Sequence, residues 1–116
     1  MIGDLFRVLG ALPLVEWRRR RLSLHHAVAR ARAQSVRRGR SAVERARLQR
    51  VIGAVDARMP GGANCVRRAL LEMSLDAGAA GERLFAGLKS GGGPRSGHAW
   101  LESHSVSESY DAVITV

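Results

Sequence analysis

The residues best suited to chemistry in this sequence are a cysteine, a histidine and an aspartate of its C-terminal half, Cys65, His98 and Asp111. A cysteine attacks a carbonyl as its thiolate, and a free thiol with a pKa of about 8.5 is mostly protonated at neutral pH. Asn64 is a strong N-cap residue, so Cys65 is expected in the first turn of a helix. There the helix dipole and unpaired backbone N–H groups favour a thiolate, and the same amides could hold the oxyanion of a tetrahedral intermediate.

His98 is the candidate base for this thiol, and then the acid, provided that its strand lies beside the helix start. A carboxylate on the next strand would orient the imidazole, and Asp111 fits that place by order and element. Three other histidines compete with His98: His25 and His26, which we discount because they lie in the arginine-rich half, and His104. The same patterns also suit an inert core thiol, a structural strand histidine and a solvated aspartate.

Apolar spacing predicts three helices in the N-terminal half. Apolar residues at three- and four-residue steps indicate a short helix over residues 5–14, interrupted by Pro13. A second helix is expected over residues 14–38, with its arginines outward. Ser41 begins a capping-box pattern for a third helix, which runs over residues 41–58.

The C-terminal half continues with one helix and three strands. The helix that begins at Asn64 is expected to end at Gly78. Alternation predicts strands over residues 84–88 and 98–102, and β-branched residues predict a third over residues 110–116. In the second strand, alternation separates His98, Trp100 and Glu102 on one face from Ala99 and Leu101 on the other. The order indicates an α+β fold, with N-terminal helices and then a Cys-bearing helix packed on a small antiparallel sheet.

The length of 116 residues allows one domain, with an arginine-rich helical part (residues 1–58) and a Cys-His-Asp part (residues 59–116). A single cysteine excludes an internal disulfide and a cysteine-rich zinc site, and it fits a reducing compartment. No apolar stretch reaches the roughly 20 residues of a membrane-spanning helix, and no signal-peptide cleavage pattern is visible. We therefore expect a cytoplasmic protein that uses no metal and no cofactor.

Charge is distributed unevenly along the chain. Residues 1–50 hold thirteen arginines and three acidic residues, whereas residues 51–116 hold six cations and seven acidic residues. Such a basic half is either a solvated face or a docking surface for an acidic partner, and we favour the second. A non-enzymatic helical protein that binds nucleic acid or an acidic partner is the main alternative function, although aromatic residues, at 4%, are too few for base-stacking platforms. Weak contact with an anionic membrane surface is a third interpretation.

Three segments of the C-terminal half are similar to those of a known family: GGANCVRRALL (residues 61–71), RLFAGL (residues 83–88) and GHAWLE (residues 97–102). Together they resemble the leader peptidases of lasso-peptide biosynthesis, which are transglutaminase-like, papain-type cysteine proteases. The resemblance covers about residues 50–116. It therefore implies a cysteine protease of the transglutaminase-like superfamily.

Residue by residue, the resemblance implies that Cys65 is the nucleophile and His98 the base. Asp111 matches the third residue of the family only by its position after the His98 strand. The rivals for that third role are Glu102 and Glu108. Asn64 stands where related sequences often carry a small hydroxyl residue, so its side chain either caps the helix or assists the oxyanion.

The resemblance also implies a reaction and its partners. The substrate would be a lasso-peptide precursor, cleaved at the junction of leader and core, with water resolving the thioester. A separate leader-recognition protein would raise the effective concentration of the scissile bond. An ATP-dependent lasso cyclase would use the new core N-terminus, and no nucleic acid is expected. An amine in place of water would give acyl transfer, and the sequence does not distinguish the two acceptors.

Overall fold

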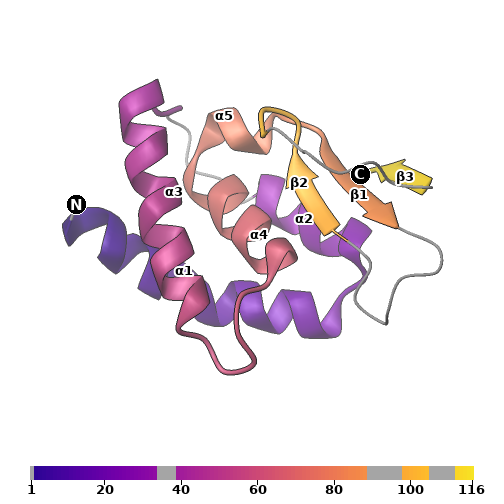
Figure 1. Cartoon of the computed structure of the whole chain (residues 1–116), viewed down its shortest axis with the longest axis horizontal. Coiled ribbons are helices and arrows are strands. Elements are labelled where there is room, and N and C mark those ends of the chain that lie inside the picture. Colours follow the sequence, from indigo (N-terminus) through magenta and orange to yellow (C-terminus); the bar gives the residue numbers. More distant parts are fainter. Residues whose placement is uncertain (1, 34–38, 89–97, 105–111) are drawn as a thin grey trace.

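The computed structural model describes residues 2–33, 39–88, 98–104 and 112–116. Their helices and strands follow one another in the order α1 (Ile2–Arg21), α2 (Leu24–Ala33), α3 (Ala42–Ala57), α4 (Cys65–Leu75), α5 (Ala77–Ala80), β1 (Leu84–Leu88), β2 (His98–Leu101) and β3 (Ala112–Thr115). Helix α4 lies at the centre (Figure 1), where it contacts α1, α2, α3, α5 and β2. The expected α+β fold with the cysteine-bearing helix on a small sheet is confirmed.

The hydrophobic core is built around α4. This helix buries apolar side chains on several sides, which is typical of a central helix rather than of a surface one. Its partners in the core come from both halves of the chain: Val8, Val15, Val28, Leu48, Ile52, Leu84 and Leu101 are all at most 2% exposed. Burial of side chains of this size contributes roughly 1.5–3 kcal/mol each. The arginine-rich helices therefore hold α4 in place through their apolar faces.

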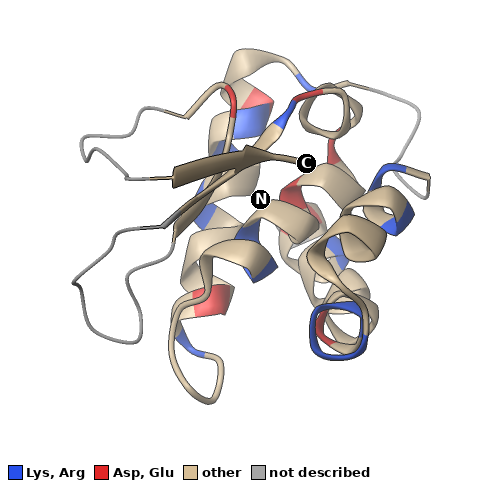
Figure 2. Cartoon of the chain, turned by 90° about the vertical axis from the view of Figure 1, so that its right-hand side faces the viewer, with Lys and Arg blue, Asp and Glu red and all other residues tan. Residues whose placement is uncertain are grey.

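The three strands form an antiparallel sheet in the order β2-β1-β3. Ala86 of β1 lies opposite Ala99 of β2 on one side and Ile114 of β3 on the other. Ala99 and Leu101 are buried, while the side chains that alternate with them are partly buried, as the sequence pattern predicts. The strands carry no Asp, Glu, Lys or Arg, and most of the described cations lie on the helices (Figure 2).

The first two helices differ from the prediction. Pro13 does not end the first helix, because α1 continues to Arg21. Its ring is exposed, and the buried side chains of Val8 and Val15 hold both halves of α1 against the core. The break falls instead at Ser23, whose hydroxyl accepts a hydrogen bond from the backbone N–H of His26 (3.3 Å) and so caps α2. Residues 34–38 of the predicted second helix lie outside the described part.

Helix α4 ends before Gly78, where the sequence pattern placed its stop. Asp76 has an extended backbone, and its Oδ1 accepts hydrogen bonds from the N–H groups of Gly78 (2.9 Å) and Arg40 (3.3 Å). Asp76 therefore ends α4 and caps the short α5. The third helix agrees with the prediction: α3 starts after Ser41 in a complete capping box with Glu44.

None of the described helices is long and apolar enough to cross a membrane.

Two glycines of the turn before α4 should resist substitution. Gly61 and Gly62 have φ angles of +87° and +84°, a region that L side chains avoid. We expect Gly61→Ala and Gly62→Ala each to lower the free energy of unfolding by about 1–2 kcal/mol in urea titrations. Gly10→Ala in the middle of α1, where an added Cβ meets nothing within 4 Å, should instead raise it by about 0.5–1 kcal/mol. Equal effects at all three positions would contradict this assignment.

Candidate active site

The turn between α3 and α4 determines where the cysteine lies. Gly61 and Gly62 reverse the chain, and the N–H of Gly62 donates to the carbonyl of Met59 (2.9 Å). Asn64 then caps α4, because its Oδ1 accepts a hydrogen bond from the N–H of Arg67 (3.0 Å). Cys65 is the first residue of the helix, where backbone N–H groups lack partners within the helix. The side-chain oxygen of Asn64 is thus engaged in the cap.

A buried ion network fixes this turn to two other helices. Asp56 of α3 is 0% exposed, and both of its carboxylate oxygens accept from the backbone N–H of Asn64 (3.1 and 3.0 Å). Arg67 of α4, 2% exposed, donates through Nη1 to Asp56 (2.6 Å) and through Nε to Glu16 of α1 (2.6 Å). One guanidinium therefore ties α1, α3 and α4 together, two residues after the cysteine.

The electrostatics of this network favour its charged form. Burial alone would lower the pKa of Arg67, but hydrogen bonds to Glu16 and Asp56 outweigh burial and raise that pKa above its ordinary value. A hydrogen bond from Arg19, together with one from Arg67, lowers the pKa of Glu16 from 4.5 to about 2. Burial of the carboxyl acts in the opposite direction but is outweighed. Both partners of the Glu16–Arg67 pair are therefore ionised at neutral pH.

The sulfur of Cys65 faces the edge strand β2. The backbone N–H of Ala99, the residue after His98, donates a hydrogen bond to Cys65 Sγ (3.3 Å). Donors of this kind stabilise a charged acceptor more than a neutral one. Cys65 itself is only partly buried. The helix start and the histidine strand are therefore neighbours, as the sequence interpretation requires.

Cys65 and His98 line one cavity of about 260 Å³. The imidazole of His98 stacks on the indole of Trp100, with ring centroids 5.8 Å apart and an interplanar angle of 17°. The other walls come from α3, α4 and the end of β2, through Gln49, Ile52, Gly53, Arg68, Ala69, Glu72, Leu101 and His104. The cavity thus runs along one face of α4, from its first residue toward Glu72.

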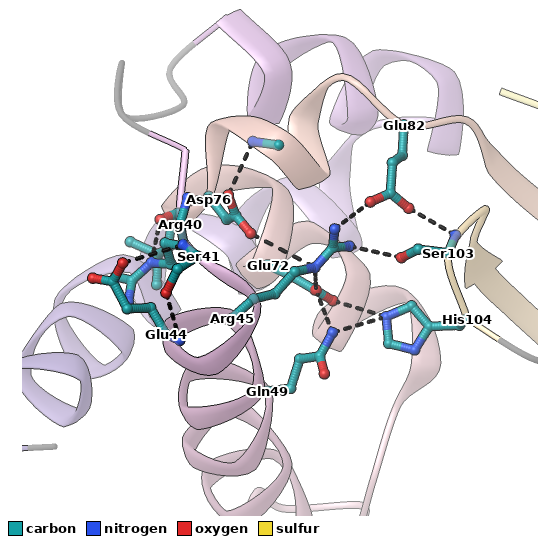
Figure 3. Close-up of polar contacts among 12 residues, drawn as sticks. Arg40, Ser41, Glu44, Arg45, Gln49, Glu72, Asp76, Glu82, Ser103 and His104 are labelled. Carbon is teal, nitrogen blue, oxygen red and sulfur yellow. Dashed lines mark hydrogen bonds and ion pairs between the residues drawn. The ribbon is translucent and has the colours of Figure 1, made fainter.

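A second arginine clamps the end of the cavity farther from Cys65 (Figure 3). Arg45 of α3 donates to Glu72 of α4 (2.9 Å) and to the hydroxyl of Ser103 after β2 (2.9 Å), and it forms an ion pair with Glu82. Glu82 in turn accepts from the N–H of Ser103 (2.8 Å). Arg45 therefore fixes the C-terminal end of the histidine strand against α3 and α4.

The charges at this clamp reinforce one another. Burial opposes the charge of Arg45, but Glu82 and Glu72 raise its pKa above the ordinary value. Burial likewise opposes the charge of Glu82, and Arg45 lowers the pKa of that carboxyl below its usual range. Arg45 and Glu82 are therefore both ionised at neutral pH.

The competing histidines lie away from the sulfur. His104 Nε2 is 3.2 Å from Glu72 Oε2 and 3.3 Å from the amide nitrogen of Gln49 (Figure 3). Glu72 follows Cys65 by seven residues, about 10 Å of helix rise, so His104 occupies the far end of the cavity. His25 and His26 are exposed on α2. Among the described histidines, His98 is the one on the strand that contacts Cys65 Sγ.

Of the three candidates for the third residue, Glu102 lies among the described residues. Asp111 and Glu108 lie outside the described residues. Glu102 is exposed at the far end of β2 from His98, where it accepts from the N–H of Arg83 (3.4 Å). Strand β3, which begins right after Asp111, pairs with β1 rather than with β2. The strand after the histidine strand is therefore two strand spacings from it, about 10 Å, and not its direct neighbour.

Sequence reasoning missed the groups that hold the site together. Asp56 follows Leu48 and Ile52 on the buried face of α3, so a carboxylate in that apolar row was the available signal. By contrast Val43, an apolar residue in the first turn of the same helix, is exposed. No comparable signal exists for Arg45, whose partners are 27 and 37 residues away. Within the described ranges, no three metal-ligating side chains gather at one point.

Comparison with protein families matches residues 9–112 to the transglutaminase-like superfamily. The match extends through the arginine-rich helices as well as the sheet, farther than the resemblance seen in the sequence. Comparisons with curated proteins and with solved structures gave no significant match.

The ion network predicts a pH-dependent stability. Because the pKa of Glu16 is about 2 in the folded chain and near 4.5 in the unfolded chain, its contribution is complete above about pH 5 and is lost as the pH falls toward 2. Urea unfolding of wild type and Glu16→Gln should differ by about 2–3 kcal/mol at pH 6 and converge at low pH. The exposed Glu102→Gln serves as the control and should change little. A difference for Glu16→Gln that does not vary with pH would refute the assigned ion pair.

Proposed function

We propose that this chain, which belongs to the transglutaminase-like superfamily, is a cysteine peptidase with Cys65 as nucleophile and His98 as base. One observation carries the proposal: both residues line the same cavity, with Cys65 Sγ at a helix start and hydrogen-bonded to the strand that bears the histidine. A helix start and a neighbouring base are two of the means by which proteins activate a thiol.

The proposed reaction is amide hydrolysis in two steps. The Cys65 thiolate attacks the scissile carbonyl, and the C–N bond breaks as His98 protonates the leaving amine. Water then adds to the thioester with His98 as base, which releases the acid and restores the thiol. Backbone N–H groups at the start of α4 are the oxyanion donors in this scheme, apart from that of Arg67, which donates to Asn64 Oδ1.

Asp111 is the proposed third residue, which would orient the His98 imidazole. Its support is the resemblance to the family and its place just before Ala112. Ala112 lies opposite Leu88 and His98 lies opposite Gly87, so the start of β3 and His98 lie at the same end of β1, while Glu102 lies beside Arg83 at the other end. Glu108 is the alternative candidate for this role.

For a substrate, we propose a lasso-peptide precursor cleaved between leader and core in the cytoplasm. A cavity of about 260 Å³ offers few contacts to a flexible peptide. A separate leader-recognition protein would supply the missing affinity by raising the effective concentration of the scissile bond. The core peptide released in this way would pass to an ATP-dependent cyclase. Acyl transfer to an amine is the alternative outcome of the same thioester.

The main rival is a basic protein that binds nucleic acid, and the roles of several arginines count against it. Arg32 donates to the carbonyls of Ala80 (3.1 Å), Glu82 (2.9 Å) and Val116 (2.9 Å). Arg40 binds Asp4 (2.8 Å), just as Arg45 and Arg67 bind internal carboxylates. These four arginines thus hold the fold together instead of forming an open phosphate-binding face.

Thiol labelling tests the activation of Cys65. We expect iodoacetamide to modify Cys65 rapidly at about pH 6.5, and His98→Ala to slow this reaction roughly tenfold or more. His104→Ala is the matched control, because His104 lines the same cavity at its other end, and it should keep the wild-type rate. A thiol as slow as free cysteine in the folded wild type would speak for the non-enzymatic rival.

Precursor cleavage tests the reaction itself. A candidate precursor peptide incubated with the chain and a leader-recognition protein should yield free leader and core, read by mass spectrometry. Cys65→Ala should abolish the products, since no other thiol exists in the chain. Equal cleavage by the alanine variant would exclude Cys65 as nucleophile.

The third residue is identified by three isosteric variants in the same assay. We expect Asp111→Asn to lower kcat about a hundredfold or more, as loss of the orienting carboxylate does in related catalytic triads. Glu102→Gln and Glu108→Gln should stay within about threefold of wild type. A large loss with Glu108→Gln alone would transfer the role to Glu108.

A further inference from the structure

An apolar groove of about 670 Å³ lies between α1 and α3, apart from the catalytic cavity. We call it the α1–α3 groove; its apolar lining is Leu5, Leu9, Leu12, Val51, Val55 and Met59. Leu5 and Leu9 are 41% and 46% exposed, which is high for leucines that sit together. The two helices pack against each other (Figure 1). The groove and the catalytic cavity share no lining residue.

Arginines border this groove along α3. Arg58 lines the groove, and Arg47 lies four residues before the groove residue Val51, on the same face of the helix. Arg50, also exposed, lies four residues before the groove residue Ala54. The acidic residues of α3 lie elsewhere, since Asp56 is buried against α4 and Glu44 caps the helix start. This rim is therefore positive, without a carboxylate of its own helix beside it.

We propose that the α1–α3 groove is the docking site for an acidic amphipathic helix of a partner protein. A groove between two helices accepts a third helix whose apolar residues recur at i, i+3, i+4 and i+7. Carboxylates beside that apolar stripe would meet the arginines of α3. The charge of the rim and the apolar lining of the groove thus both favour an acidic amphipathic helix.

Two other occupants fit less well. A second copy of this chain, docked groove to groove, would set the arginine row of one α3 against that of the other, and like charges repel. A membrane surface is flat, whereas Leu12, Val51 and Val55 are partly covered on the floor of the groove. Both occupants are outcomes of the test below. The proposal is independent of the peptidase assignment, because no residue of the catalytic cavity takes part in it.

The test measures binding of a fluorescent peptide to the full chain by anisotropy. The probe is a helix of about 21 residues, with leucines at heptad positions a and d and glutamates at the flanking positions. A matched peptide carries lysines in place of the glutamates. We expect the glutamate peptide to bind at least tenfold more tightly than the lysine peptide, with an affinity that falls as salt rises.

Variants locate the binding site. Leu9→Glu should weaken binding of the glutamate peptide tenfold or more, and Arg47→Glu combined with Arg50→Glu should weaken it and reduce its salt dependence. Leu14→Glu is the matched control, because Leu14 lies on α1 outside the groove and its exposed fraction of 45% is close to the 46% of Leu9. If circular dichroism shows that Leu9→Glu perturbs the fold, Leu9→Ser replaces it. Thiol labelling of Cys65 should be unchanged in each variant.

Several results would overturn the proposal. They are equal binding of both peptides, loss of binding with Leu14→Glu as much as with Leu9→Glu, or no binding at all. Leu9-dependent dimerisation in sedimentation would assign the groove to a second copy. Leu9-dependent partition onto vesicles of phosphatidylcholine and phosphatidylglycerol, without peptide binding, would assign it to the membrane.

Discussion

One buried guanidinium organises this molecule. Arg67 of α4 donates hydrogen bonds to Glu16 of α1 and Asp56 of α3. Asp56 also accepts a hydrogen bond from the backbone N–H of Asn64. Removing one partner from such a network leaves a buried charge uncompensated, which typically costs about 3–5 kcal/mol. The network therefore holds the start of α4, and with it the sulfur of Cys65, at a defined place on three helices.

Two arginines, Arg45 of the basic half and Arg67 of α4, fix the two ends of the cavity. Arg67 secures the end that carries Cys65, while Arg45 joins Glu72 to the turn after β2 and so holds the histidine strand. Between them the N–H of Ala99 reaches Cys65 Sγ. Part of the arginine-rich composition thus serves the geometry of the site. Arg47 and Arg50 of α3, by contrast, are exposed.

Local signals in the sequence predicted much of the fold. The capping box at Ser41, the cap at Asn64 and the alternation after His98 each depend on neighbouring residues, and each is present in the structure. Pro13 was misleading because packing on both sides of the proline outweighs one lost hydrogen bond. The Arg67 and Arg45 networks join residues far apart in the chain, so no local pattern announces them. The contact between β2 and the start of α4 likewise required the tertiary structure.

The account rests on Cys65 acting as a covalent nucleophile, and a trapped acyl-enzyme tests this most directly. A precursor is mixed with the chain and its recognition protein, quenched in acid within the first turnover and read by intact-protein mass spectrometry. The account predicts a mass increase equal to the leader acyl group, held as a thioester on Cys65 and absent from Cys65→Ala. Cleavage that proceeds at the same rate in Cys65→Ala, with no adduct on the wild type, would contradict it.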